Sequence, residues 1–155
     1  MKNTLALALL LSLLLPFTHA ADLPSGTAKG TCAKDGAAPV ALAYAGAFVD
    51  EKDSDKPTLL ILSDIKLPTN TWKSEFDLMG SSSKYPFSGA IFFLDKDGNV
   101  FRTDFYWKGR QSSVSGYFQL TLSGKAGKEL TGTVASKAGD ATDPKVDATF
   151  HATVP

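Results

Sequence analysis

Apolar and polar residues alternate with period two in several separate segments of the chain, a pattern typical of β-strands with one buried face. The alternation is clearest over residues 146–154, where Val146, Ala148, Phe150, Ala152 and Val154 are separated by polar residues. Strands are also predicted at residues 27–33, 40–49, 59–62, 87–94, 100–107, 116–122 and 130–135. About eight short strands with regularly spaced turns predict an all-β fold with one short helix, either an antiparallel β-sandwich or an open β-barrel.

Two of these segments form the centre of the predicted fold. Residues 59–62 are continuously apolar, which predicts a strand covered on both faces. In residues 40–49 the larger apolar side chains stand at even positions and alanines mainly at odd ones, so one face is expected in the core and the other close to a neighbour. Residues 50–57, DEKDSDKP, are too polar to bury and are predicted to form a solvated hairpin loop.

A single helix is predicted over residues 69–80. Trp72, Phe76 and Met79 recur at i, i+4 and i+7, Thr69 and Asn70 supply capping oxygens, and Gly80 is placed to end the helix. An aromatic stripe at this spacing is usually core, so we expect it to pack on the sheet rather than to contact a ligand.

Residues 95–99, DKDGN, give the strongest hairpin signal. In the strand that follows, Phe101, Phe105 and Trp107 are expected on one face, opposite Arg102, Asp104 and Tyr106. The turn does not have the ligand spacing of an EF-hand calcium loop, so no calcium site is predicted there.

The first residues have the features of a signal peptide. Lys2 precedes an apolar run from Leu5 to Leu15, and Thr18 and Ala20 provide small residues for cleavage after Ala20. The run is shorter than the roughly 20 residues of a membrane-spanning helix, so no stable membrane anchor is expected. Residues 1–20 are therefore predicted to be removed, leaving residues 21–155 as one periplasmic or secreted domain.

Composition then excludes several functions. The chain carries 16 basic and 16 acidic residues, and loss of Lys2 would leave a slight acidic excess, which gives no support for nucleic-acid binding. After cleavage only Cys32 and His151 remain of their types, so no disulfide, zinc or copper site, catalytic triad or cofactor is predicted. We expect Cys32 to be buried rather than paired with another chain, and His151 to be solvated beside Asp147 and Thr149.

The order VALAYAGAF, charged loop, KPTLLILSDIKLP resembles a group of small exported bacterial proteins, and modules of larger ones, with a comparable two-strand signature. The resemblance continues through SGAIFF, SGYFQLTLSGKAGKELTGTVASKAG and the closing DATFHATV. It implies export and a single β-rich domain. It implies no catalytic residue, because the group has no established activity.

These observations predict a non-enzymatic binding protein whose partner is another envelope or secreted protein, acting as an inhibitor, immunity protein or accessory factor. The contacts are expected from the charged loop, the region 106–113 or a sheet edge, with Tyr106, Trp107, Arg110, Glu51 and Asp53 as candidate residues. One alternative is a carrier of an apolar small molecule or lipid, with Phe92, Phe101, Phe105 and Trp107 lining a cup under the Trp72/Phe76 helix. A less favoured alternative is a hydrolase that uses carboxylates alone.

Overall fold

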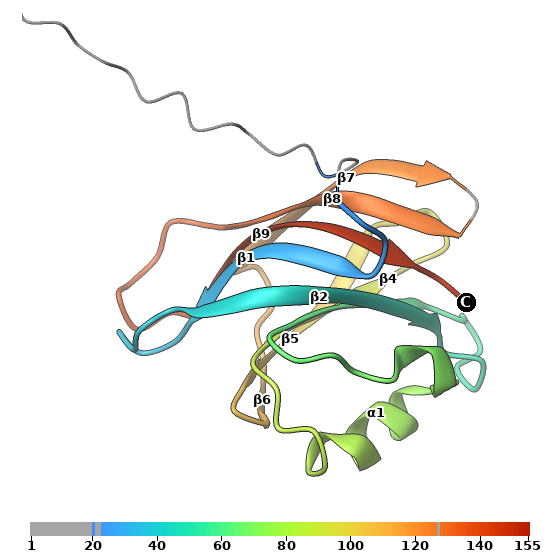
Figure 1. The fold of residues 1–155 in the computed structure, drawn as a ribbon, viewed down its shortest axis with the longest axis horizontal. Helices are drawn as coiled ribbons and strands as arrows, with labels where there is room; N and C mark the ends of the chain where they lie inside the picture. The colour runs from blue at the N-terminus through green and yellow to red at the C-terminus, as the bar shows by residue number, and fades with distance from the viewer. Residues whose placement is uncertain (1–19, 21–22, 127) are drawn as a thin grey trace, which may run out of the picture.

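The computed structural model describes residue 20, residues 23–126 and residues 128–155. The predicted signal peptide lies almost entirely outside these residues. In the described part of the chain, nine antiparallel strands form one strongly curled sheet in the order β6-β5-β4-β3-β2-β1-β9-β8-β7 (Figure 1). Their bounds are β1 Thr27–Ala33, β2 Val40–Val49, β3 Thr58–Ser63, β4 Gly89–Leu94, β5 Val100–Trp107, β6 Arg110–Ser113, β7 Phe118–Ala126, β8 Glu129–Ser136 and β9 Lys145–Thr153. The all-β prediction with an open barrel is confirmed.

An inner core fills the concave side of the sheet. It takes the inward residues of β9, namely Val146, Ala148, Phe150 and Ala152, as their alternation predicts. It also contains side chains from both ends of the sheet, because the ring of Phe118 on β7 lies 6.3 Å from the rings of Phe92 and Phe105. The sheet therefore curls around one packed interior, although β6 and β7 remain unpaired edges.

A second core lies on the convex side of β2–β5. There Phe48, Leu59, Ile61, Ile91, Phe93 and Tyr106 point away from the inner core and are covered by Leu67, Trp72, Leu78 and Phe87. The apolar run of β3 is thus buried on both faces, as predicted, with Leu60 and Leu62 in the inner core. Figure 1 shows the covering layer, with helix α1 (Glu75–Ser82) on one side of the curled sheet and the β7–β8 hairpin at the far side.

The alternation predicted for β2 is wrong beyond Leu42. Leu42, Ala45 and Ala47 all belong to the inner core, whereas Tyr44 is partly exposed and Phe48 lies in the outer core. The pairing of β1 with β2 shifts register between Thr27 and Gly30, which changes which residues of β2 point inward. Side-chain size alone therefore did not identify the inward face.

The predicted helix 69–80 is two elements. A 3-10 helix, η2 (Thr69–Thr71), ends at the extended residue Trp72, and α1 begins only after Ser74, whose hydroxyl accepts a hydrogen bond from the Asp77 N–H. Trp72 and Phe76 are consequently not on the same helix. Trp72 is buried against Phe48, but Phe76 and Met79 are exposed and Leu78 is the buried residue of α1, so the predicted buried stripe is wrong. Gly80 lies inside α1 rather than at its end.

Strand β6 is not among the strands predicted from the sequence. β5 and β6 are joined by Lys108 and Gly109, with φ values of 50° and 80°. Two residues with positive φ form the type of turn that favours tight hairpins. The strand itself, RQSS, is a polar edge strand without hydrophobic alternation.

The hairpin predicted at residues 95–99 is confirmed. Asp95 Oδ1 accepts hydrogen bonds from the N–H groups of Asp97 and Asn99, at 2.9 and 2.8 Å, and Gly98 has a φ of 88°. The side chain of Asn99 also donates to Asp95, and this bond is the largest of several that hold the pKa of Asp95 below its ordinary value. The predicted loop 50–57 is likewise a hairpin connection, between β2 and β3.

Candidate functional site

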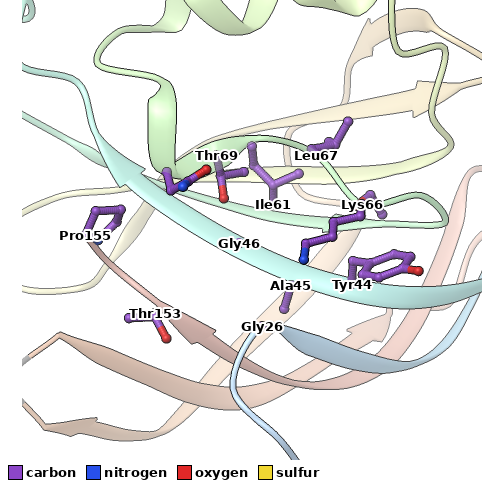
Figure 2. A pocket seen from close by; sticks show the side chains of 12 residues that line it. Gly26, Tyr44, Ala45, Gly46, Ile61, Lys66, Leu67, Thr69, Thr153 and Pro155 are labelled. Atoms are coloured by element: carbon purple, nitrogen blue, oxygen red, sulfur yellow. The ribbon is translucent and has the colours of Figure 1, made fainter.

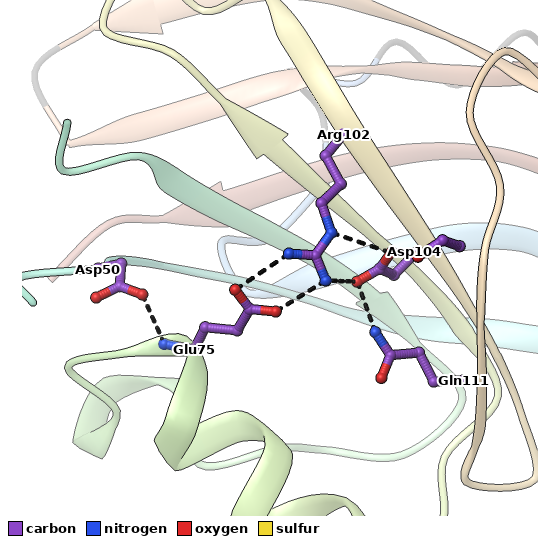
Figure 3. Close-up of polar contacts among 6 residues, drawn as sticks. Asp50, Glu75, Arg102, Asp104 and Gln111 are labelled. Atoms are coloured by element: carbon purple, nitrogen blue, oxygen red, sulfur yellow. Dashed lines mark hydrogen bonds and ion pairs between the residues drawn. The ribbon is translucent and has the colours of Figure 1, made fainter. Parts of the chain in front are cut away.

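The largest polar network among the described residues joins α1 to the convex face of β5 (Figure 3). The Arg102 guanidinium donates to both carboxylate oxygens of Glu75, at 3.2 and 2.8 Å, and also to Asp104. Asp104 is only 1% exposed and accepts two further hydrogen bonds of 2.8 Å, from Gln111 and Ser113. The network therefore fixes the first turn of α1 to the sheet.

Arg102 is held by charge and by an aromatic ring. Its guanidinium carbon lies 4.2 Å from the ring centroid of Phe93. Burial by itself lowers the pKa of Arg102, but the hydrogen bonds to Asp104 and Glu75 outweigh burial and raise it. Glu75 and Asp104 are thus bridged by a permanent cation.

Asp50 makes the second link between the sheet and the helix. It follows β2 directly, and its Oδ2 accepts a hydrogen bond of 2.8 Å from the Glu75 N–H at the start of α1. Its Oδ1 accepts from the N–H groups of Lys52 and Asp53, at 2.9 and 3.2 Å. Asp50 is buried, in contrast to the exposed residues 51–56 of the same loop. The prediction that the whole segment is too polar to bury is therefore wrong at this residue, because three backbone donors satisfy its carboxylate.

Three large apolar side chains are exposed around this network. Phe76 is 74% exposed, Met79 is 49% exposed and Phe101 is 59% exposed. Phe76 and Met79 lie on the outer face of α1, and the ring of Phe101 packs edge-on against Phe93, 6.2 Å away. We call these three residues the apolar surface.

A separate groove lies on the convex side of β2, where the covering layer ends (Figure 2). It has a volume of about 410 Å³. Its walls come from the loop after β3, with Lys66, Leu67 and Thr69, and from Thr153 and Pro155 at the end of β9. Thr69 sits directly over Gly46, where any Cβ would meet the Thr69 hydroxyl at 2.6 Å. Among the described residues that line the groove, Lys66 has the only charged side chain.

The residues predicted as binding residues are not brought together. Glu51 and Asp53 are exposed on the loop between β2 and β3, whereas Trp107 and Arg110 lie at the opposite end of the strands, where β5 turns into β6. Arg110 is exposed and Trp107 is half-buried, stacked on Phe105.

Tyr106 is buried and stacks on Phe87 with 4.6 Å between ring centroids. Burial, followed by the charge of Asp104, raises the pKa of Tyr106 to about 12. Its side chain therefore belongs to the outer core and not to a contact surface.

The cup predicted for an apolar ligand is not formed. Phe92 and Phe105 are packed in the inner core, Phe101 is exposed, and α1 covers the opposite face of the sheet. The sequence placed Phe101 and Phe105 on the same face of one strand, but the pairing of β4 with β5 shifts register near Val100, so that alternation is interrupted. These aromatic residues therefore do not share a cavity.

His151 is largely buried and has other partners than those predicted. Its Nδ1 lies 2.7 Å from the Leu23 carbonyl oxygen, and its Nε2 lies 2.8 Å from Glu129. Asp147 instead accepts a hydrogen bond from the Ser136 N–H. Residues two or four apart on a strand are nearly 7 Å or more apart, so the side-chain partner of His151 is Glu129 on the adjacent strand β8 rather than a residue of β9. Cys32 is buried, as predicted.

Asp50, Glu75, Arg102 and Asp104 were not among the candidate residues predicted from the sequence. The one available signal was the placement of Arg102 and Asp104 on the same face of β5, since Glu75 and Asp50 are distant in sequence. In the described part of the chain, no three His, Cys, Asp or Glu side chains are arranged to hold a metal ion.

The fold and its surfaces define a class, an all-β open barrel with one helix fixed to its outer face. Comparison with known proteins found no matching family model, curated protein or solved structure. None of the helices in the described residues has the length and apolar character needed to cross a membrane.

Proposed function

We propose that this protein is an exported, non-enzymatic binding protein that recognises another envelope or secreted protein through the apolar surface. The observation that carries the proposal is the exposure of Phe76, Met79 and Phe101 around a rigid polar network. Exposed aromatic side chains gathered in one region are typical of protein interfaces, in which such residues supply much of the binding energy. The proposal of export rests on the signal-peptide pattern of residues 1–20.

The surroundings of the apolar surface favour recognition by a preformed surface. Leu78 anchors α1 in the outer core, while Asp50 and Arg102 fix its first turn. Side chains that are already held in place lose less conformational freedom when a partner binds. The helix therefore presents Phe76 and Met79 from a fixed position.

The hydrolase alternative has less support. The carboxylates of Glu75 and Asp104 are bridged by Arg102. Glu129 is hydrogen-bonded to His151, and the nearby Ser25 hydroxyl donates to Glu129 rather than to the imidazole. A hydroxyl activated by histidine requires a direct hydrogen bond to the imidazole, and the Ser25 hydroxyl does not make one.

An affinity pull-down from envelope extract tests the proposal. We expect the wild-type protein to retain a partner that the Phe76→Ser, Phe101→Ser double variant does not retain. Tyr117→Ser is a matched control, because Tyr117 is an exposed aromatic residue outside the apolar surface. Equal retention by the double variant, or loss in the Tyr117→Ser control alone, would contradict the proposed surface.

A carrier of a small apolar molecule is a second candidate, favoured by the groove beside β2. Ile61, Leu67 and Pro155 give it apolar walls, and its volume is within the range of small-molecule sites. Native mass spectrometry of protein purified from its own cells distinguishes the two functions. A co-purifying ligand that is lost in Gly46→Leu supports the carrier, because that side chain would enter the position occupied by Thr69 at the groove wall.

A further inference from the structure

Two hollows are lined by the loop between β2 and β3, one together with helix α1 and the other together with the hairpin between β4 and β5. The first, of about 280 Å³, is lined by Asp50, Lys52, Asp53, Glu75, Phe76 and Met79. The second, of about 520 Å³, is lined by Asp53, Asp55, Pro57, Asp95, Lys96 and Phe101. Because Asp53 lines both, the two hollows are adjacent and a single bound segment can reach both.

The two hollows have the same chemical composition. Each contains an exposed aromatic side chain, Phe76 in the first and Phe101 in the second. Each is also lined by three carboxylates and one lysine, and in the first hollow two of the carboxylates, Asp50 and Glu75, already accept hydrogen bonds from backbone N–H groups and from Arg102. The Asp55 carboxylate makes no hydrogen bond or ion pair with any described residue, so it is available to an incoming group. The hollows therefore favour a side chain that is positively charged at its end and able to pack on an aromatic ring.

Arginine meets both requirements better than lysine. Its planar guanidinium stacks on aromatic rings and pairs with carboxylates through two parallel hydrogen bonds. The protein itself contains this arrangement nearby, because Arg102 stacks on Phe93 and forms a two-point pair with Glu75. Phe93 in turn contacts Phe101, which lines the second hollow.

We propose that the two hollows bind two arginine side chains of one extended segment of the partner protein. This inference rests on the proposed function and specifies the chemistry of its partner. Phe76 and Phe101 each stack against one guanidinium, and Asp53 contributes negative charge to both positions. The excess of carboxylates over lysines disfavours acidic segments at the same surface.

Fluorescence anisotropy with labelled peptides tests this inference without the natural partner. The probes are synthetic peptides that carry two arginines separated by one, two or three residues. In the matched control peptides citrulline replaces both arginines, which preserves shape and removes charge. We expect at least one arginine peptide to bind at least tenfold more tightly than its citrulline counterpart, with weaker binding as the salt concentration increases.

Variants of the protein locate the binding to the hollows. Phe76→Ser and Phe101→Ser are each expected to weaken binding of that peptide by about tenfold, and Asp53→Asn by less, whereas Tyr117→Ser leaves it unchanged. Equal binding of arginine and citrulline peptides, or equal binding by wild type and both phenylalanine variants, would overturn the inference.

The peptide and pull-down experiments fail independently. If a partner is retained through Phe76 and Phe101 but no arginine peptide binds, the proposed function stands and the arginine inference is wrong. If arginine peptides bind through both hollows but the extract yields no partner, the arginine inference is supported and the proposed protein partner is not.

Discussion

The two halves of the curled sheet differ in how many of their faces are covered. In β3 and β4 nearly every residue is buried, because the inner core lies on one side and the helix and its flanking loops lie on the other. In β8 and β9 only alternate residues are buried, and the convex face carries polar groups such as Asp147, Thr149 and Thr133. The covering layer also supplies Phe76 and Met79 of the apolar surface and one wall of the groove, whereas Phe101 belongs to β5.

Polar residues also have different roles in the two halves of the sheet. In the covered half Asp50, Arg102 and Asp104 lie between layers and fix one layer to the other. In the bare half polar residues mostly face solvent, and the His151–Glu129 pair ties the segment before β1 to the sheet. Charged groups buried between the layers fix the position of α1 on the sheet. Charged groups on a solvent-exposed face contribute little to the stability of the fold.

The largest expected difference between the halves concerns outward-facing side chains. Leu59→Ala in β3 should lower the free energy of unfolding by about 2–5 kcal/mol, because it leaves a cavity in the outer core. Thr133→Ala on the outward face of β8 should cost at most about 1 kcal/mol. Urea unfolding measures both values, and similar costs would contradict the distinction between covered and bare halves.

The next largest effect is expected at Asp104. Asp104→Asn removes the charge that faces Arg102, while Gln111 and Ser113 still donate toward the same position. We therefore expect the free energy of unfolding to fall by about 1–3 kcal/mol. Gln111→Ala removes one hydrogen-bond donor to Asp104 and should lower the free energy of unfolding by a smaller amount. If both variants unfold at the same urea concentration, the network does not hold the layers together as described.

The burial of Cys32 in the inner core can be tested through the pH dependence of protein stability. Burial, followed by the charge of Asp64, raises the pKa of its thiol from 9.0 to about 12. Between these values the unfolded chain has lost the thiol proton that the folded chain keeps, so stability falls as pH rises, by up to about 1.4 kcal/mol per pH unit.

Urea unfolding of wild type and Cys32→Ala at pH 8 and pH 10 measures this effect. The stability of wild type should decrease more than that of the variant, by about 1 kcal/mol. Parallel pH profiles would mean that the thiol is accessible to solvent in the folded protein.

A smaller effect is expected at the start of α1. Ser74→Ala removes the acceptor of the Asp77 N–H and should cost about 1 kcal/mol. Hydrogen exchange should then become faster in α1 and remain unchanged in β8 and β9, because the helix covers only the other half. Faster exchange in both halves would show that they unfold as one unit.

The smallest effect is expected at Phe76. Because this side chain is mostly exposed, Phe76→Ser should change the unfolding free energy by no more than about 0.5 kcal/mol. A large loss, measured by the same urea titration, would mean that Phe76 supports the fold, and the binding experiments would then require another variant of the apolar surface.

Local patterns predicted much of the sheet and little of the site. The bounds of β1, β2 and β5 and the turn at Asp95–Asn99 follow from alternation and turn residues that lie next to one another in the chain. The predicted helix start at residue 69 differs from the observed start of α1, because Thr69, Asn70 and Ser74 are all suitable N-cap residues. The choice of Ser74 goes with the packing of Trp72 in the outer core, which the local pattern does not specify. The role of Asp50 required knowledge of which helix approaches it from 25 residues away.

By itself the sequence determined the all-β class, the two-sided burial of β3 and the inward face of β9, since period-two alternation and continuous apolar runs are properties of single strands. Only the tertiary structure decided which residues of β2 point inward, which residues of α1 remain exposed and which carboxylates meet Arg102. The physical reason is that strand register and layer packing depend on contacts between residues far apart in the chain, which a local pattern does not specify.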